Sequence, residues 1–364
     1  MSNQVPPRGG SGMRDRADEF VPGMSGGAVP PKRRGRRVLV GLLVVVLVLI
    51  LAAAGAVFAL TQSIGNDISR IPDAFRNIPA ADRPATFGGT TFLLVGTDTR
   101  ATEATTGSDA PADVDAGSQR SDVIMLATVQ PDGTTGSVVS IPRDSWVDIP
   151  GRGMNKINAA YAFGGPSLLI ETVEGLTGVR VDHFGVIDFA GFQTLVDSVG
   201  GIDVNVAEAT SNAGVDFAAG DNHLDGAQAL AYVRQRYDLP NGDIDRAKRQ
   251  QNALRALLNR VQQQASTNPL ALYDLSQNVG DTVSIDDTLS NTGLASLAVQ
   301  YRDLRSSSVS FVTTPVAGLG RKGVQSVVYL DEGKAKGLWG AIRNGSVAQY
   351  VDANPSQALG DIPS

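Results

Sequence analysis

The stretches TTFLLVG, residues 90–96, and DVIMLATV, residues 122–129, decide the fold of this chain. Both are apolar at most positions, including neighbouring ones, which is typical of central strands whose two faces are both covered. Polar and turn-forming residues follow each of them. Five more segments have the length and composition of strands: GSVVSI (136–141), HFGVIDF (183–189), IDVNV (202–206), SVSFVTT (308–314) and VQSVVYL (324–330).

Helical periodicity lies between these segments, at about 166–177, 189–199, 225–236, 245–265, 288–303 and 332–343. Alternation of this kind predicts an α/β fold with a sheet covered on both faces. We see no internal repeat and no change of composition after residue 88. We therefore expect one domain over 89–345, a linker over 61–88 and a C-terminal tail over 346–364. Residues 101–118, rich in Ala, Thr and Asp, are expected to form a mobile insertion without the spacing of a calcium loop.

Residues 38–60 are uncharged and apolar, and KRRGRR precedes them. At about 1.5 Å per residue such a run spans a bilayer core. The basic flank predicts a cytoplasmic N-terminus, with a disordered tail over 1–37. A cleaved signal peptide is the alternative, although the apolar run is longer than a usual signal core. The expected location is the cell membrane, with one pass and an extracytoplasmic domain.

The charge and composition exclude several classes of protein. The net charge is −6, and because residues 1–37 carry +5, the rest of the chain carries −11. An acidic body argues against broad nucleic-acid binding. The absence of cysteine excludes disulfides and thiolate sites, and the two histidines have no partner at motif spacing. No phosphate-binding GxxxxGK[ST] loop is present, and GLGRKG (318–323) precedes a strand, so we expect a turn there and no nucleotide.

The segment VRQRYDLPNGDIDRAKRQQ, residues 233–251, concentrates arginine. On a helix with about 100° per residue, Arg246 and Gln250 lie at the margin of the apolar stripe, while Lys248 points to solvent. A half-buried arginine needs a partner, and a helix N-terminus favours an anion. A structural carboxylate is the other possible partner, with Asp243 or Asp245 also available as a cap. Arg234 and Arg236 would diverge by about 200° on a regular helix, which leaves their orientations open.

Charged residues also lie at the ends of three predicted strands: Asp98 and Arg100, Arg120 and Asp122, and Arg143 and Asp144. Strand ends form the binding crevice of an open α/β sheet. Two carboxylates on adjacent strands suit Mg²⁺, and arginine offers paired donors to phosphate. Turn-forming aspartates and surface arginines are the alternative at any one of these positions.

Seven blocks in order resemble the LytR–CpsA–Psr (LCP) family of Gram-positive cell envelopes. They are FLLVGTDTR, RSDVIMLATV, SIPRDSWVDIPG, MNKINAAYAFGG, VDHFGVIDFAGFQTLVDSVGGIDVNV, LDGAQALAYVRQR and GDIDRAKRQQ, and the resemblance covers the predicted anchor and about 89–345. It implies a three-layer α/β/α sandwich with a central mixed sheet and an apolar channel for a polyprenyl chain. It further implies transfer of a glycopolymer from a polyprenyl pyrophosphate carrier to peptidoglycan, at the 6-hydroxyl of muramic acid, with polyprenyl phosphate released.

The resemblance also implies roles for individual residues. Asp98 and Asp122 would bind Mg²⁺, with Mn²⁺ as a substitute. The residues implied in catalysis are Asp98, Asp122, Arg143, Asp243 and Arg246. Those implied in pyrophosphate binding are Arg100, Arg120, Arg143, Lys156, Arg234, Arg236, Arg246 and Gln250.

Two other functions stay open from the sequence: a pyrophosphatase acting on the same carrier, and a non-enzymatic envelope module that binds lipid or glycan. The glycan is also open, among arabinogalactan, teichoic acid and capsule-like polymers. Arg outnumbers Lys 25 to 6, and Ala and Gly are abundant. This composition is associated with GC-rich genomes and favours an actinobacterial host.

Overall fold

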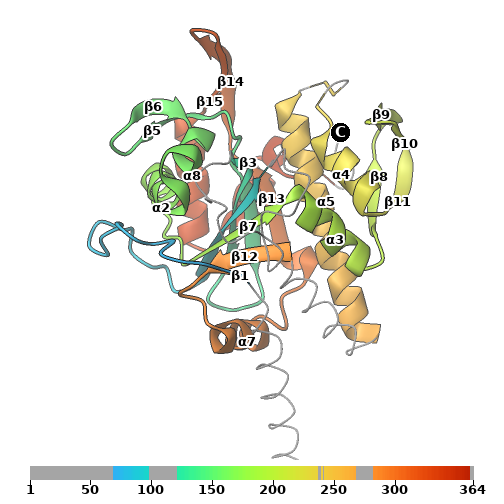
Figure 1. Cartoon of the computed structure of the whole chain (residues 1–364), viewed down its shortest axis with the longest axis horizontal. Helices are drawn as coiled ribbons and strands as arrows, with labels where there is room; N and C mark the ends of the chain where they lie inside the picture. Colours follow the sequence, from blue (N-terminus) through green and yellow to red (C-terminus); the bar gives the residue numbers. More distant parts are fainter. Residues whose placement is uncertain (1–68, 98–120, 237–238, 241, 268–281, 361–364) are drawn as a thin grey trace, which may run out of the picture. The chain divides into compact units, whose positions relative to one another are not determined.

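The computed structural model describes residues 69–97, 121–236, 239–240, 242–267 and 282–360 (Figure 1). The chain divides into two compact units, 1–54 and 55–364, and all the described residues belong to the second. The expected N-terminal tail, the expected membrane helix over 38–60 and the insertion over 101–118 lie outside the described residues. Within the described ranges, no helix is both long and apolar enough to cross a membrane.

A seven-stranded mixed sheet forms the centre of the described unit, in the order β1-β12-β7-β2-β3-β4-β13. Three of its neighbouring pairs are parallel and three are antiparallel. The strands are β1 (Ser69–Ile71), β2 (Thr90–Thr97), β3 (Ser121–Val129), β4 (Gly136–Ser140), β7 (His183–Asp188), β12 (Val283–Asp286) and β13 (Val309–Thr313).

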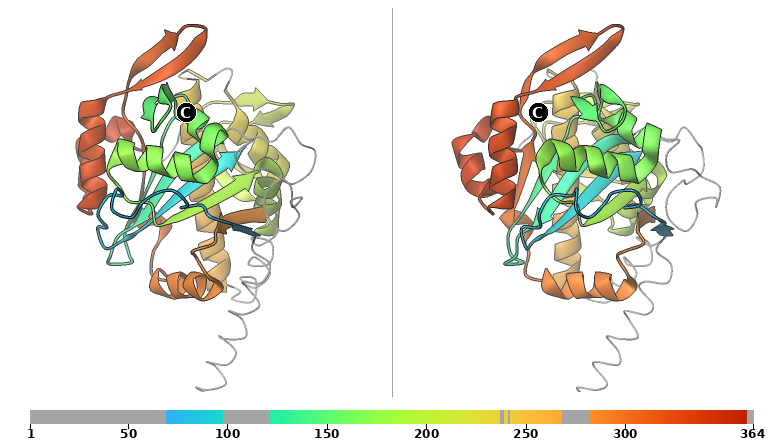
Figure 2. Two further views of the ribbon diagram at one scale, coloured as in Figure 1. Left: turned by 60° about the vertical axis from the view of Figure 1, so that its left-hand side comes forward. Right: turned by 90° about the vertical axis from the view of Figure 1, so that its left-hand side faces the viewer.

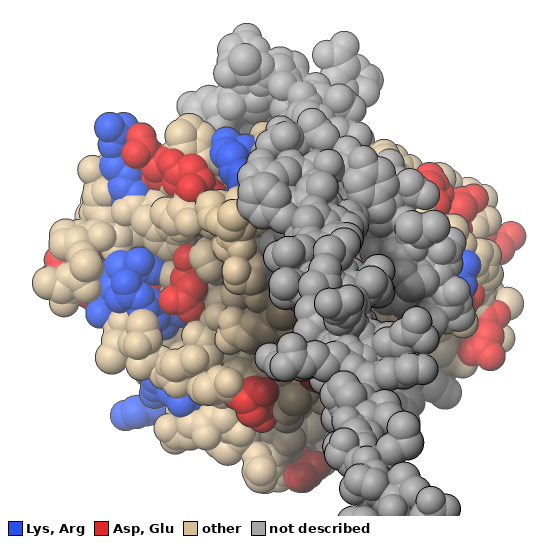
Figure 3. All heavy atoms as spheres, turned by 90° about the horizontal axis from the view of Figure 1, so that it is seen from below, with Lys and Arg blue, Asp and Glu red and all other residues tan. Residues whose placement is uncertain are grey.

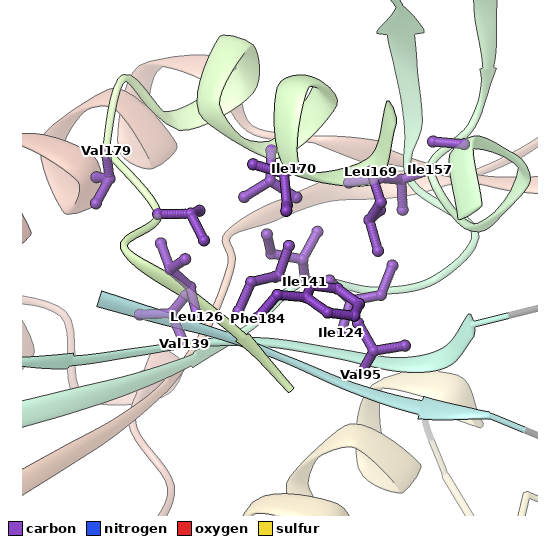
Figure 4. Packing of buried hydrophobic residues seen from close by; sticks show 14 of the residues in the cluster. Val95, Ile124, Leu126, Val139, Ile141, Ile157, Leu169, Ile170, Val179 and Phe184 are labelled. Carbon is purple, nitrogen blue, oxygen red and sulfur yellow. The ribbon is translucent and has the colours of Figure 1, made fainter. Parts of the chain in front are cut away.

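Alternate residues of the central strands supply two separate cores. Leu93, Val95, Ile124 and Leu126 face α2 (Asn158–Thr177) and α8 (Glu332–Arg343), whose Leu169, Ile170, Leu338 and Ile342 complete one apolar cluster. Figure 4 shows Leu169 and Ile170 of α2 directed at Val95, Ile124 and Phe184 of the sheet. Because successive side chains of a strand point to opposite faces, Leu94 and Met125 are directed the other way.

The second face of the sheet is covered by α5 (Asp243–Thr267), with Leu254 and Leu258 packed near Met125 and Val138. Beyond it, α3 (Phe189–Ser198), α4 (Gly226–Arg234) and β8 (Ile202–Val206) form a third apolar cluster with α5. The views of Figures 1 and 2 place helices on both faces of the sheet. The expected α/β/α order of layers is therefore observed.

Several shorter elements surround the sheet. Hairpins are formed by β5 (Trp146–Ile149) with β6 (Gly153–Lys156) and by β14 (Val316–Lys322) with β15 (Gln325–Leu330). The remaining elements are β9 (Thr210–Asn212), β10 (Val215–Phe217), β11 (Gly220–Leu224), α7 (Asn291–Gln300), α9 (Val347–Ala353) and the short helices η1 (Ser306–Ser308) and η2 (Pro355–Gln357).

The structure differs from the sequence-based boundaries at both ends. The expected linker over 61–88 contains β1, and the expected tail over 346–364 contains α9. Ile71 and Val347 are buried in the first core, which is why both segments belong to the domain.

Two predicted strands also lie outside the central sheet: 202–206 pairs with β11, and 324–330 pairs with β14. In the predicted turn GLGRKG, Gly318 and Gly320 lie within β14, and only Gly323 adopts a left-handed φ of 59° at the turn.

Candidate active site

Asp122 is the extra residue of a β-bulge at the beginning of β3. Gly96 pairs with Val123 and Thr97 pairs with Ser121, so Asp122 has no opposite residue on β2. Bulges redirect side chains and are frequent beside active sites. Gly96 permits the close approach of the two strands, because a Cβ there would lie 2.9 Å from Cβ of Val123.

The turn that follows β4 brings a second group of charges to the bulge. Arg143 forms an ion pair with Asp122 through Nη1. Asp144 Oδ1 lies 3.1 Å from Nζ of Lys156, which is on β6. Asp122, Arg143 and Asp144 therefore line one small pocket, together with residues of β4 and of α5.

The first turns of α5 close that pocket from the other side. Asp243 begins the helix, and its Oδ1 lies 3.3 Å from Nη2 of Arg246. Gln250, one turn later, donates from Nε2 to the carbonyl of Val233 at 3.4 Å. The side chain of Arg246 is only 11 % exposed, as its predicted place at the margin of the apolar stripe requires. Lys248 differs from the prediction, because it is half-buried beside Asp245 rather than fully in solvent.

The pKa values of the two arginines that line the small pocket are shifted in opposite directions. For Arg143, burial opposes the charged form, but attraction to Asp122, Asp144 and Asp243 outweighs it and raises the pKa. For Arg246, burial and then repulsion from Arg143 lower the pKa despite Asp243. A guanidinium group held at such a cost is stabilised when an anion binds beside it.

Arg234 and Arg236 face the same groove. The divergence of about 200° expected on a regular helix does not occur, because the helix ends between them. Helix α4 ends at Arg234, and Gln235 has extended backbone with φ −60° and ψ 134°. Residues two apart on extended backbone point to the same side. The groove has a volume of about 630 Å³ and, among the described residues, its lining holds four arginines and one acid, Asp122. The arginines are Arg143, Arg234, Arg236 and Arg246.

Gln235 itself points inward and is 1 % exposed. Its Oε1 accepts from Nη1 of Arg249 at 2.6 Å, and its Nε2 donates to Oγ1 of Thr210 at 2.5 Å. Arg249 is 2 % exposed and lies over the ring of Tyr232 at 4.7 Å. Arg249 is therefore a structural residue of the 233–251 segment, because it holds Gln235 in the turn between Arg234 and Arg236.

We expect Arg249→Ala to lower the free energy of unfolding by about 3 kcal/mol, through a lost charged hydrogen bond and a buried cavity. The freed turn should also weaken binding of an anionic ligand to Arg234 and Arg236. Denaturant titration and ligand titration measure the two effects. Arg302→Ala, which removes a side chain that is 72 % exposed, is the control and should cost less than about 1 kcal/mol. A loss equally small for Arg249→Ala would contradict this role.

An apolar cavity of about 290 Å³ lies against the α5 face of the sheet. Its walls come from β2, β7 and β12 and from α3, α5 and α7. His183 and Asp188 are the only ionisable residues in the described lining; the rest is mainly aliphatic and aromatic, including Leu94, Met125, Phe189, Phe192, Leu254 and Ile285.

The cavity and the charged groove are continuous in their linings. Gln250 and Val123 line the small pocket, the groove and the cavity, and Phe189 and Val233 line the last two. The guanidinium carbon of Arg234 lies 4.8 Å from the ring centre of Phe189, so a positive charge is placed where the groove meets the cavity. The arrangement fits an amphipathic molecule with an anionic head and an apolar tail.

The described carboxylates fit a divalent cation only in part. Asp122 lies in the pocket, but Asp98, its expected partner, lies outside the described residues, as do Arg100 and Arg120. Thr97, which precedes Asp98, pairs with Ser121, which precedes Asp122. Within the described residues, no group of three or more acidic or histidine side chains could hold a metal. Mg²⁺ accepts one or two carboxylates when phosphate oxygens complete its shell, so Asp122 suits it as one ligand.

The sequence-based residues that the structure describes are therefore brought together: Asp122, Arg143, Lys156, Arg234, Arg236, Asp243, Arg246 and Gln250. Asp144, noted at a strand end, joins them through Lys156. Phe189 and Val123 were missed, because an apolar residue gives no sequence signal for lining a cavity rather than a core.

The charged groove differs from the face of the molecule drawn in Figure 3. On the described surface of that face, Lys and Arg are interspersed with Asp and Glu.

Comparison with known proteins identifies the family. Residues 63–343 match the model of the LytR_cpsA_psr family. The chain belongs to the LytR–CpsA–Psr family. A probable cell wall biosynthesis protein LcpB of Corynebacterium glutamicum is 34 % identical over 293 residues, covering 79 % of this chain and 68 % of its own. A polyisoprenyl-teichoic acid–peptidoglycan teichoic acid transferase TagU of Enterococcus faecalis is 40 % identical over 189 residues, covering 50 % and 59 %.

Solved structures agree with the LytR–CpsA–Psr assignment. TagV of Bacillus subtilis is similar with a TM-score of 0.57 and 26 % identity, over 74 % of this chain and 99 % of that one. TagT bound to LI-WTA is similar with a TM-score of 0.55 and 26 % identity, over 71 % and 90 %. The chain spans between about half and two thirds of the length of the curated relatives that it matches.

Proposed function

We propose that this LytR–CpsA–Psr protein transfers a glycopolymer from a polyprenyl pyrophosphate carrier to the 6-hydroxyl of muramic acid in peptidoglycan. The observation that supports it best is the continuity of an arginine-rich groove with an apolar cavity. The relative TagU bears the name of a transferase of this kind. Arabinogalactan is the glycan that we favour, for an actinobacterial host.

The apolar cavity would hold the first prenyl units of the carrier. Burial contributes about 0.8 kcal/mol per methylene, so a few units give substantial affinity. The pyrophosphate would then lie against Arg143, Arg246 and Gln250. The free energy that Arg246 loses to burial and to Arg143 would be recovered in part when this anion binds.

The reaction forms one bond and breaks one. The acceptor oxygen bonds to the phosphorus that carries the glycan, and the phosphoanhydride bond to the lipid phosphate breaks. Polyprenyl phosphate leaves, and the hydroxyl proton is released. Because the donor already holds a phosphoanhydride, no nucleotide is required, and the protein mainly positions the reactants and neutralises charge.

The metal in this proposal is Mg²⁺ held by Asp98 and Asp122, and it would neutralise charge on the phosphate oxygens. We also propose that residues 38–60 anchor the chain in the cell membrane, with a cytoplasmic N-terminus and the site on the outer side. The carrier lipid would then lie in the same membrane.

The decisive experiment supplies lipid-linked glycan to the full chain in detergent, with and without peptidoglycan oligomers. We expect ligated glycan only with the acceptor and Mg²⁺, and loss of the product with chelator. Free glycan phosphate in both samples would instead identify a pyrophosphatase. Binding of the carrier without any turnover would identify a non-enzymatic envelope module.

A further inference from the structure

The β14–β15 hairpin projects from the described unit beside β5 and β6 (Figures 1 and 2). Its base is joined to the candidate active site, because the N–H of Val328 donates to the carbonyl of Asp144 at 2.9 Å. Val328 also lines the small pocket with Asp144 and Arg246. The hairpin therefore begins at the small pocket and extends away from it.

One face of this hairpin is built around aromatic rings and a lysine. Gly318 pairs with Tyr329, and Gly320 with Val327. A Cβ at Gly320 would lie 2.4 Å from Cε2 of Tyr329, so the missing side chain gives the ring its place. Lys322 lies on the same face, with its Nζ 5.9 Å from the ring centre of Trp146 on β5.

Trp146 connects this face to the pocket. It pairs across the β5–β6 hairpin with Lys156, whose Nζ contacts Asp144. Trp146 and Tyr329 are both partly exposed, and Lys322 is exposed. We call Trp146, Gly320, Lys322 and Tyr329 the Trp146 surface.

We infer that the Trp146 surface binds the peptidoglycan acceptor; the inference rests on the proposed function. Flat aromatic faces accept the C–H faces of sugar rings, and Trp and Tyr are favoured at binding surfaces because they also offer a polar group. Peptidoglycan carries carboxylates on its peptides. Residues 316–330 hold Arg321 and Lys322 and no acid, in a chain whose net charge is −6.

The order of the sheet supports the direction of approach. The apolar cavity lies on the β12, β7 and β2 side of β3, whereas the small pocket and the hairpin base lie on the β4 side. In phosphoryl transfer the attacking and leaving oxygens lie roughly in line across the phosphorus. If the lipid phosphate leaves toward β7, the acceptor must arrive from the β4 side, where the Trp146 surface lies.

The test uses the full chain with Lys322→Glu and Trp146→Ala, which alter one side chain of the β14–β15 hairpin and one of β5. We expect the KM for peptidoglycan oligomers to rise about tenfold in each variant, with the KM for the lipid-linked donor unchanged; a tenfold change corresponds to the loss of one well-placed contact. Arg302→Glu is the matched charge reversal. Arg302 is exposed and precedes the first residue of β13, which pairs with Gly136, whereas the small pocket lies at the other end of β4, at Ser140. Thermal unfolding checks that all three variants are folded.

A binding measurement separates this inference from the proposed function. The chain has two tryptophans, and Trp339 is only 4 % exposed, so a fluorescence change on adding soluble peptidoglycan fragments reports Trp146. We expect saturable binding that Lys322→Glu weakens, and weaker binding of N-acetylglucosamine oligomers, which lack carboxylates. Binding without any transfer would leave the surface supported and the transferase rejected. An unchanged acceptor KM, or a raised donor KM instead, overturns the inference.

Discussion

Arg246→Ala should reduce kcat/KM for glycan transfer by about a thousandfold, the range seen when a charge-stabilising group is removed from a phosphoryl-transfer site. Its guanidinium group lines the small pocket with Arg143 and lies 3.3 Å from Oδ1 of Asp243, where the pyrophosphate would bind. We expect the free energy of unfolding to change by less than about 1 kcal/mol, because burial and Arg143 already disfavour the charge. Steady-state kinetics and denaturant titration measure the two quantities.

The control for this substitution is Arg255→Ala on the same helix. Arg255 hydrogen-bonds to Asn252 and to the carbonyl of Gly360, and it does not line the charged groove. Its removal should leave transfer nearly unchanged. If Arg246→Ala instead unfolds the protein, as loss of a structural ion pair would, the anion-binding role of Arg246 is wrong.

Gly185→Leu should weaken binding of the lipid-linked donor by about a hundredfold while making the protein slightly more stable. Gly185 lies on β7 and lines the apolar cavity. A Cβ there would meet Leu94 at 3.5 Å and Ile285 at 4.0 Å, which are ordinary contacts, so a larger side chain can extend into the cavity. Excluding three or four methylenes of the lipid costs about 3 kcal/mol, and replacing a strand glycine contributes about 0.5–1 kcal/mol of stability.

Titration of the donor and thermal unfolding test this prediction together. Gly175→Leu adds the same volume at an exposed position of α2 with open space around it, and it should leave donor affinity unchanged. A soluble donor analogue without the lipid should bind wild type and Gly185→Leu equally. Undiminished affinity of Gly185→Leu for the full donor would show that the lipid does not enter this cavity.

Much of the fold could be predicted because its signals are local. The apolar runs that became β2 and β3 must be buried on both faces wherever they lie, and the period of 243–267 requires a helix with one apolar side. Strands β1 and β12 could not be predicted, because Ser69–Ile71 and Val283–Asp286 are too short to show a pattern of their own. The edge of β7 offers backbone hydrogen bonds to β12, and the free edge of β12 then offers them to β1.

The candidate site also has features that local sequence predicted and features that it could not predict. Residue type and helical angle predicted the placement of Arg246 and Gln250 at the edge of a buried stripe. They could not predict which way the side chains of Arg234 and Arg236 point, because their orientations depend on where α4 ends. Gln235, held by Arg249 from a different helix, turns the backbone there and brings both arginines into one groove.

The sequence by itself determined the α/β class, the apolar and polar faces of the main helices, and the family. Only the tertiary structure decided that Arg249 is structural, that Asp122 sits in a bulge, and that a cavity joins the charged groove. These features depend on contacts between different secondary-structure elements, such as Arg249 of α5 with Gln235 after α4 and Gly96 of β2 with Val123 of β3. Local periodicity reports which residues are buried, whereas long-range packing decides which buried residues surround a space and which fill it.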